Sequence, residues 1–107
     1  MPATALDDPI LKRFRAALDQ LYGDRIERVV LYGSRARGDF HAESDYDIAV
    51  FLHELTDTWK EVDRIVAITT DILMDTGEVI NAMVFPAGAY HKRTGFMHEV
   101  RLDGIDL

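Results

Sequence analysis

Three short apolar segments, each bounded by charged or turn-forming residues, limit what this 107-residue chain can fold into. They are rich in β-branched and aromatic residues, which favour strands, and they cover residues 26–32, 46–52 and 78–85. None is long enough to cross a membrane as a helix. The third is expected to end at Pro86, because proline cannot donate a hydrogen bond to a sheet. The sequence therefore predicts one sheet built from these strands.

Helical periodicity marks the segments around the strands. Residues 9–22 repeat apolar side chains at helical spacing and follow Asp8 and Pro9, a common pair at helix starts. A further short helix is expected at 96–102. These elements predict an α/β fold, with a single sheet flanked by helices.

The longest predicted helix, 58–75, determines the direction of a strand. Thr58 and Glu61 form a capping-box pattern at its start, and apolar residues between 62 and 73 form a stripe. We expect that stripe and Trp59 in the core. Because this helix separates the second and third strands, those strands are predicted to be parallel.

Composition narrows the classes of protein to consider. The length predicts one domain over residues 1–107, and the absence of cysteine excludes disulfide frameworks and thiol catalysis. A net charge of −7 makes direct nucleic-acid binding unexpected. The first ten residues lack the basic start and apolar block of a signal peptide, and no segment could span a membrane, so a cytoplasmic location is expected.

The residues after the first strand carry phosphate-binding chemistry. Gly33 and Ser34 follow a buried strand directly, where backbone N–H groups of a turn can surround phosphate oxygens. Arg35 and Arg37 then supply guanidinium groups that can bind a polyphosphate. Ordinary surface charge is the alternative interpretation for either arginine.

Two carboxylates precede or begin the second strand. Asp45 and Asp47 share a strand face, with Cα atoms roughly 6.5 Å apart. Two carboxylates so placed repel each other unless a cation lies between them, and oxygen ligands suit Mg²⁺ or Mn²⁺. Paired metals assist displacement at phosphorus. The alternative is that both are structural residues of a strand entry, but the combination with Gly33 and Ser34 favours metal-dependent nucleotidyl transfer.

The string from Gly33-Ser34, through ten residues, to Asp45-Tyr46-Asp47 resembles the signature of the DNA polymerase β-type nucleotidyltransferase superfamily, and most of the chain is similar to its minimal prokaryotic members. The resemblance implies a mixed sheet, a Gly-Ser turn that holds the triphosphate of ATP, metal binding and catalysis by Asp45 and Asp47, and a triphosphate contact from Arg37. It further implies an antitoxin that transfers AMP to a tyrosine of a HEPN-type ribonuclease toxin within a hetero-oligomer.

One departure from that family concerns the third strand. Active members usually carry a third carboxylate there, and this chain has Asn81 or Met83 at the expected position. Asparagine can bind a metal but is a poor general base, whereas Glu78 and Asp75 are acids at the preceding turn. Two hypotheses stay open: a protein adenylyltransferase, and a weakened member that neutralises its partner by contact alone. A transferase for an aminoglycoside or an RNA end is disfavoured, because it needs a second domain or subunit.

The C-terminal tail is the predicted partner surface. Tyr90, Phe96 and Met97 lie among charged residues, and a core of this size is not expected to cover them.

Overall fold

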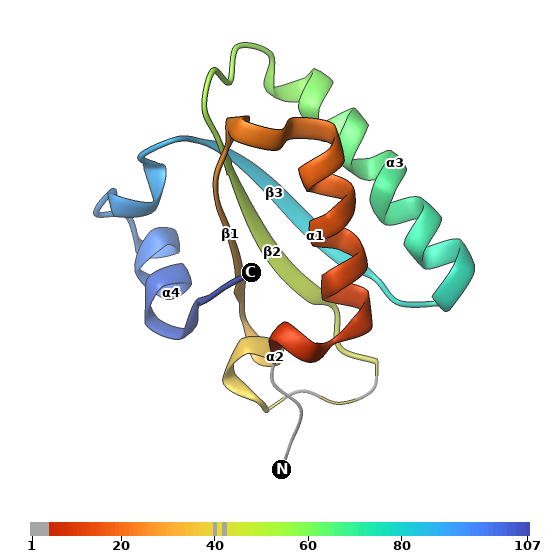
Figure 1. Ribbon diagram of the computed structural model, residues 1–107. Helices are drawn as coiled ribbons and strands as arrows, with labels where there is room; N and C mark the ends of the chain where they lie inside the picture. Colours follow the sequence, from red (N-terminus) through yellow and green to blue (C-terminus); the bar gives the residue numbers. More distant parts are fainter. Residues whose placement is uncertain (1–4, 40, 42) are drawn as a thin grey trace.

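The computed structural model describes residues 5–39, 41 and 43–107. Its sheet has the strand order β3-β2-β1-β4, formed by Ile80–Pro86, Tyr46–Leu52, Ile26–Tyr32 and Ile105–Asp106. β1 runs antiparallel to β2 and β4, whereas β2 and β3 are parallel (Figure 1). The predicted mixed sheet and the parallel crossover are therefore confirmed.

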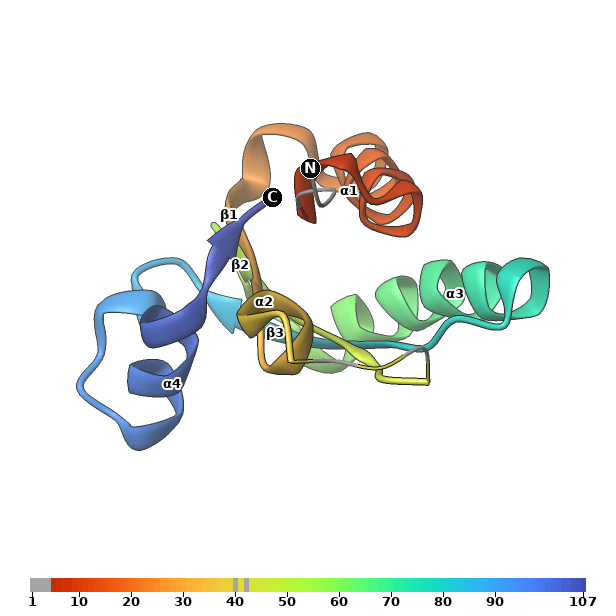
Figure 2. The same ribbon diagram turned by 90° about the horizontal axis from the view of Figure 1, so that it is seen from below.

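Helices cover both faces of this sheet. α1 (Pro9–Tyr22) and α3 (Thr58–Thr76) lie over one face, and α4 (Gly95–Asp103) lies over the other (Figure 2). The short helix α2 (Ser34–Arg37) follows β1, and 3-10 turns occupy Ala5–Asp7, Gly23–Arg25 and Ala89–His91. Among these described helices, none is both long and apolar enough to span a membrane.

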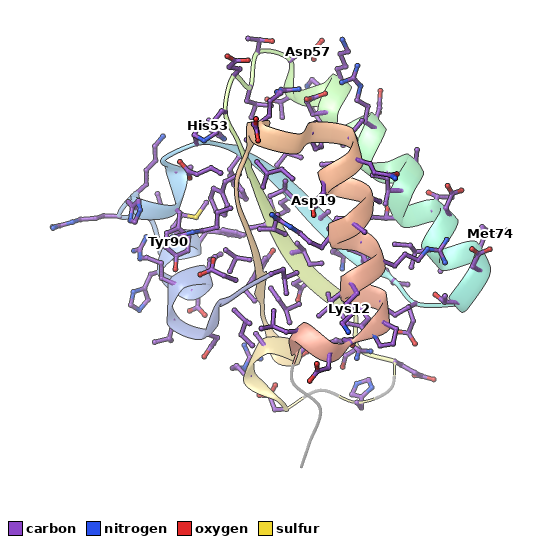
Figure 3. All side chains as sticks on the ribbon, viewed as in Figure 1. Lys12, Asp19, His53, Asp57, Met74 and Tyr90 are labelled. Carbon is purple, nitrogen blue, oxygen red and sulfur yellow. The ribbon has the colours of Figure 1, made fainter. Side chains whose placement is uncertain are left out.

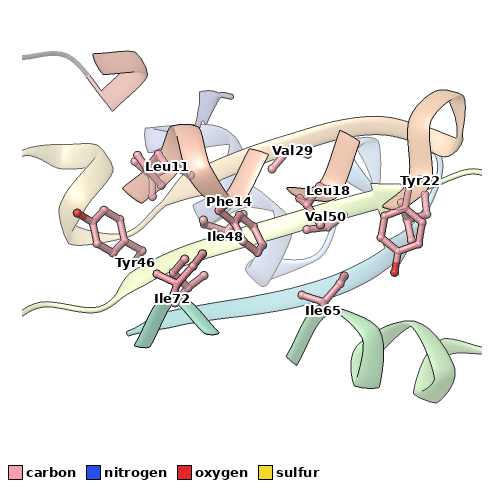
Figure 4. Close-up of a cluster of buried hydrophobic side chains, with 13 residues drawn as sticks. Leu11, Phe14, Leu18, Tyr22, Val29, Tyr46, Ile48, Val50, Ile65 and Ile72 are labelled. Carbon is pink, nitrogen blue, oxygen red and sulfur yellow. The ribbon is translucent and has the colours of Figure 1, made fainter. Parts of the chain in front are cut away.

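The larger core lies between the sheet and the helix pair α1 and α3. Phe14 and Leu18 of α1 meet Ile48 and Val50 of β2, and Ile65 of α3 contributes to the same cluster (Figure 4). All five are buried. Alternating residues of β2 point to the opposite face, where Ala49 and Phe51 pack with α4. β2 is therefore the strand around which both faces are built.

Helix α3 faces the sheet at a different angle from the one its sequence predicts. Asp57 caps the helix, because its side chain accepts a hydrogen bond from the Lys60 amide at 3.1 Å, so the predicted Thr58–Glu61 capping box is wrong. Trp59 is 79% exposed rather than in the core, and Val66 and Leu73 are also exposed. The buried side of the helix passes through Glu61, Ile65 and Ile72 instead.

The buried acid at the start of this stripe is held by ion pairs. Glu61 contacts Arg25 at 2.9 Å and Arg64 at 3.2 Å, and Tyr22 donates a hydrogen bond to its carbonyl. Burial, with the Glu61 charge beside it, raises the pKa of Tyr22 to about 12. The buried face of α3 thus includes a polar residue, Glu61. The helix is therefore rotated relative to the orientation that the apolar stripe alone predicts.

Two further differences concern the C-terminal half. The third strand begins at Ile80 rather than Glu78, because the Glu78 amide bonds to the Thr76 hydroxyl at 3.1 Å. Met97 of α4 is buried and Phe96 is half-buried, so neither is the freely exposed surface residue that the sequence predicts. The tail instead forms the second core.

Truncating Phe14 and Trp59 should have opposite consequences for stability. Phe14→Ala removes a fully buried ring, which typically costs about 3–5 kcal/mol of unfolding free energy. Trp59→Ala removes an exposed ring and should change the same free energy by less than about 1 kcal/mol. Urea denaturation of both variants measures the difference, and comparable losses would contradict the described orientation of α3.

Candidate active site

The turn after β1 is built around the close approach of a carboxylate. Gly33 has a φ of +77°, and a Cβ placed on it would lie 2.6 Å from Oδ2 of Asp47. Glycine is therefore required both for the backbone conformation and for the space. The carbonyl of Gly33 accepts the amides of Ala36 and Arg37, which starts α2. Gly33, Ser34 and Asp47 are thereby brought together as the sequence predicted.

The parallel pairing of β2 and β3 places a third polar side chain beside the two aspartates. Asp47 is the register partner of Asn81, and the amide nitrogen of Asn81 donates to Oδ2 of Asp45 at 2.8 Å. Of the two positions considered for the third acid, Asn81 is the one at the site. Asp45 and Asn81 are exposed, whereas Asp47 is half-buried.

The pKa of the Asp47 carboxyl depends on its position in the site. Burial raises the pKa of its carboxyl above the usual value, and the nearby charge of Asp45 acts in the same direction. The Asn81 amide and the charge of Arg37 oppose that rise. A carboxylate held in this way gains from a cation placed between it and Asp45.

The donors suit a hard divalent cation. Two carboxylates and the side-chain amide of Asn81 converge, and oxygen donors of these kinds are the ligands of Mg²⁺ and Mn²⁺. In the described part of the chain, no group of three or more acidic, histidine or cysteine side chains is arranged to hold a metal. The site therefore offers two carboxylates where a three-acid site would offer one more.

Arg35 is packed rather than presented at the surface. Its side chain is 9% exposed, donates to the Ser44 carbonyl at 2.9 Å, contacts Glu78 at 3.4 Å and stacks over Tyr46 at 3.9 Å. These contacts tie α2 to the segment before β2 and to the start of β3. Its predicted phosphate contact stays a prediction, and this packing does not favour it.

Arg37 lies at the edge of the site. It contacts Asp39 at 3.1 Å and Asp103 at 3.6 Å, and the hydrogen bond that it donates to Asp39 is the main cause of its raised pKa. Its influence on the pKa of Asp47 shows that its charge acts on the site. The contact with Asp103 could not be predicted from the sequence, since that residue lies far along the chain at the end of α4.

The acids named as possible substitutes for a third carboxylate are engaged elsewhere. Glu78 pairs with Arg35, and Asp75 pairs with Arg13 of α1 at 2.7 Å. Neither stands beside Asp45 and Asp47 as Asn81 does. The structure thus favours a two-acid arrangement.

The position of Tyr32, the last residue of β1, beside Asp47 was not predicted from the sequence. Tyr32 is the antiparallel partner of Asp47, and its hydroxyl lies 3.6 Å from the sulfur of Met83. Burial, and next the Asp47 charge, raise the pKa of Tyr32. The one available signal was strand parity, because an antiparallel partner of Asp47 has to point to the same face.

Comparison with known proteins agrees with this geometry. The family model described as "Polymerase beta, Nucleotidyltransferase" matches residues 18–105. The chain belongs to this nucleotidyltransferase family. It is 30% identical over 98 residues to "Putative protein adenylyltransferase MJ0141" of Methanocaldococcus jannaschii, covering 92% of this chain and 95% of that protein.

Solved structures share the fold at lower identity. A "putative nucleotidyltransferase" from Sulfolobus solfataricus superimposes with a TM-score of 0.65 at 18% identity, covering 91% of this chain and 75% of that one. A toxin–antitoxin structure with AMP-PNP gives a TM-score of 0.62 at 18% identity, covering 89% and 69%. The predicted polymerase β-like fold is confirmed.

Neutralising Asp47 should stabilise the protein in the absence of metal. Because the folded-state pKa of Asp47 is raised, its ionised form costs stability, and that cost develops as pH rises through the folded pKa. Asp47→Asn should therefore raise Tm at pH 7, by an amount that shrinks as the pH is lowered towards the acid range. Thermal unfolding with chelator present measures this.

The same unfolding series contains its own control. Added Mg²⁺ should raise the Tm of the parent chain and leave that of Asp47→Asn nearly unchanged, since binding to the folded state stabilises it. A variant that melts below the parent at pH 7 would show that Asp47 serves the fold.

Proposed function

We propose that this chain transfers AMP from ATP to a hydroxyl of a protein partner, with Asp45 and Asp47 binding Mg²⁺ or Mn²⁺ and acting in catalysis. The observation that carries the proposal is the close approach of Asp47 to the Gly33 turn, with Asn81 as its strand partner and Asp45 hydrogen-bonded to Asn81. The adenylyltransferase name of the relative MJ0141 and the AMP-PNP in a structural neighbour support the choice of reaction and of ATP.

The proposed AMP transfer requires few groups from the protein. The acceptor oxygen bonds to the α-phosphorus of ATP, the bond between the α-phosphorus and the bridging oxygen breaks, pyrophosphate leaves, and the acceptor proton passes to water or to pyrophosphate. The bound cations would neutralise charge on the phosphates. Gly33 and Ser34 lie at the start of α2, where the first backbone N–H groups of a helix have no partner within that helix. Arg37 would exchange its contacts with Asp39 and Asp103 for the triphosphate.

The proposed partner is a toxin of the HEPN ribonuclease type, with this chain as its antitoxin in a hetero-oligomer. The toxin–antitoxin assemblies among the structural neighbours support this choice. A contact-only antitoxin is the second candidate, and it is favoured by one observation: an amide, Asn81, stands where a third carboxylate would act as base.

Removing both charges should abolish transfer without unfolding the chain. In Asp45→Asn/Asp47→Asn, label from α-labelled ATP should no longer reach the partner, and ATP should lose its Mg²⁺-dependent affinity, since both effects need the two carboxylates. Filter-bound label and isothermal titration with Mg²⁺ or chelator measure the two quantities. Unchanged labelling would place the catalytic acids elsewhere, and absence of ATP binding by the parent chain would favour the contact-only antitoxin.

Restoring an acid on β3 should increase transfer. Asn81→Asp places a carboxylate beside Asp45 and Asp47, and a well-placed base contributes up to about 10²–10⁴-fold to rate. Val79→Asp is the matched control, because Val79 is exposed and lies two residues before Asn81, just ahead of β3. Initial rates of AMP transfer compare the two, and an Asn81→Asp rate no higher than that of the parent would remove Asn81 from the reaction.

A further inference from the structure

An apolar groove opens on the same face of the sheet as the two aspartates. It lies between β3 and the segment formed by Ala89–His91 and α4, and has a volume of about 260 Å³. Its lining includes Met83, Phe85, Phe96 and Met97, with Lys92 and Thr94 at its wall. We refer to it as the β3–α4 groove.

The groove begins next to the candidate active site, because Met83 of its lining is the next residue after Asn81 on the same face of β3. Side chains on one face of β3 follow the order Asn81, Met83 and Phe85, so Met83 lies roughly 6.6 Å along the strand from the residue that contacts Asp45. Tyr32, the strand partner of Asp47, touches Met83 from the other side. An extended ligand can therefore occupy the site and the groove together.

The floor of the groove is preformed by aromatic packing. Phe96 contacts Tyr32 with ring centroids 5.5 Å apart and Phe85 at 5.6 Å, and Phe85 stacks on Phe51 at 5.5 Å. Phe51 is in turn edge-on to Tyr90, which Figure 3 labels on the same side of the molecule as α4. Met83 is nonetheless 45% exposed, so the apolar entrance nearest the aspartates is partly open to solvent.

The far side of the groove is basic in an otherwise acidic protein. Lys92 and the adjacent Arg93 are exposed and form no ion pair within the described residues. Seven other arginines contact carboxylates, and Arg101 is held by the carbonyls of Tyr90 and Lys92. Two unpaired cations at the far side of the β3–α4 groove favour a ligand that is apolar near the aspartates and carries a negative charge at its far end.

We propose that the β3–α4 groove binds the acceptor segment of the partner, an extended polypeptide in which an acidic residue lies within a few positions of the modified tyrosine. This inference rests on the proposed function. With its hydroxyl at the aspartates, a tyrosine ring lies over Met83, where sulfur and ring make a favourable contact. A neighbouring apolar side chain fills the space by Phe85 and Phe96, and the acid reaches Lys92 and Arg93.

The charges beside the groove also favour this acceptor segment over the nucleoside of ATP as the ligand of the groove. Adenosine is neutral and would leave Lys92 and Arg93 without an anion, whereas the triphosphate is drawn to the Gly33 turn on the β1 side of the aspartates. An acidic polypeptide uses both parts of the groove. We therefore assign the groove to the acceptor.

Two symmetric peptides test the assignment. Glu-Glu-Leu-Tyr-Leu-Glu-Glu and Lys-Lys-Leu-Tyr-Leu-Lys-Lys carry the same acceptor with opposite charge, and fluorescence anisotropy of labelled peptides measures their Kd values without ATP. The net charge of −7 alone would favour the lysine peptide. The groove predicts the reverse, at least a tenfold preference for the glutamate peptide.

Charge-reversal variants show which residues cause the preference for the glutamate peptide. Lys92→Glu/Arg93→Glu should reverse the preference and leave ATP affinity unchanged, and Met83→Asn should weaken both peptides about equally. The matched control is Lys12→Glu/Lys60→Glu, which reverses two lysines outside the groove that also form no ion pair within the described residues. Equal effects of the two double variants would overturn the proposal, as would a loss of ATP affinity confined to the groove variants.

AMP transfer to the glutamate peptide, measured with α-labelled ATP and Mg²⁺, separates the two proposals. Charge-dependent binding without transfer would support the groove and contradict the proposed reaction. Transfer that Lys92→Glu/Arg93→Glu leaves unchanged would support the reaction and overturn the groove.

Discussion

The contact between the Asp47 carboxylate and Gly33 is the constraint on which the rest of the site depends. It requires β1 to be followed by a residue without a Cβ, and it fixes where α2 starts relative to β2. The antiparallel register of Tyr32 with Asp47 holds this contact, and the parallel register of Asp47 with Asn81 adds the third strand. Backbone pairing of the strands thus positions Tyr32, Asp47 and Asn81, whereas Ser34 and Arg37 are carried by α2.

The helices contribute by anchoring that sheet edge from outside. Asp8, the N-cap of α1, accepts a hydrogen bond from the Tyr46 hydroxyl at 2.7 Å, next to the strand position of Asp47. Burial, and then this bond, raise the pKa of Tyr46, so the phenol stays protonated and keeps donating. Arg35 stacks on the other side of the same ring. One aromatic side chain therefore links α1, α2 and β2.

Much of this arrangement could be predicted from the sequence where the signal was local. The segments Pro9–Tyr22, Ile26–Tyr32 and Tyr46–Leu52 match their predicted bounds, because caps, glycines and β-branched runs act over a few residues. The exposure of Trp59 and the burial of Met97 could not be predicted in the same way. Both depend on which face of a helix meets the sheet, and distant residues such as Arg25, which pairs with Glu61, decide that face.

For the candidate site, the sequence indicated which residues take part, but not which strand register brings them together. The alternation of side chains along a strand places Asn81 on the face of the aspartates only for one register between β2 and β3. That register depends on how α3 connects the two strands. That register also explains why one sheet face can serve two ligands. Asp45 and Asp47 lie at the start of β2, with the Gly33 turn towards β1 and Asn81 and Met83 towards β3. A phosphate donor held on the first side leaves the second open, so a proposed acceptor would approach from β3 without displacing it.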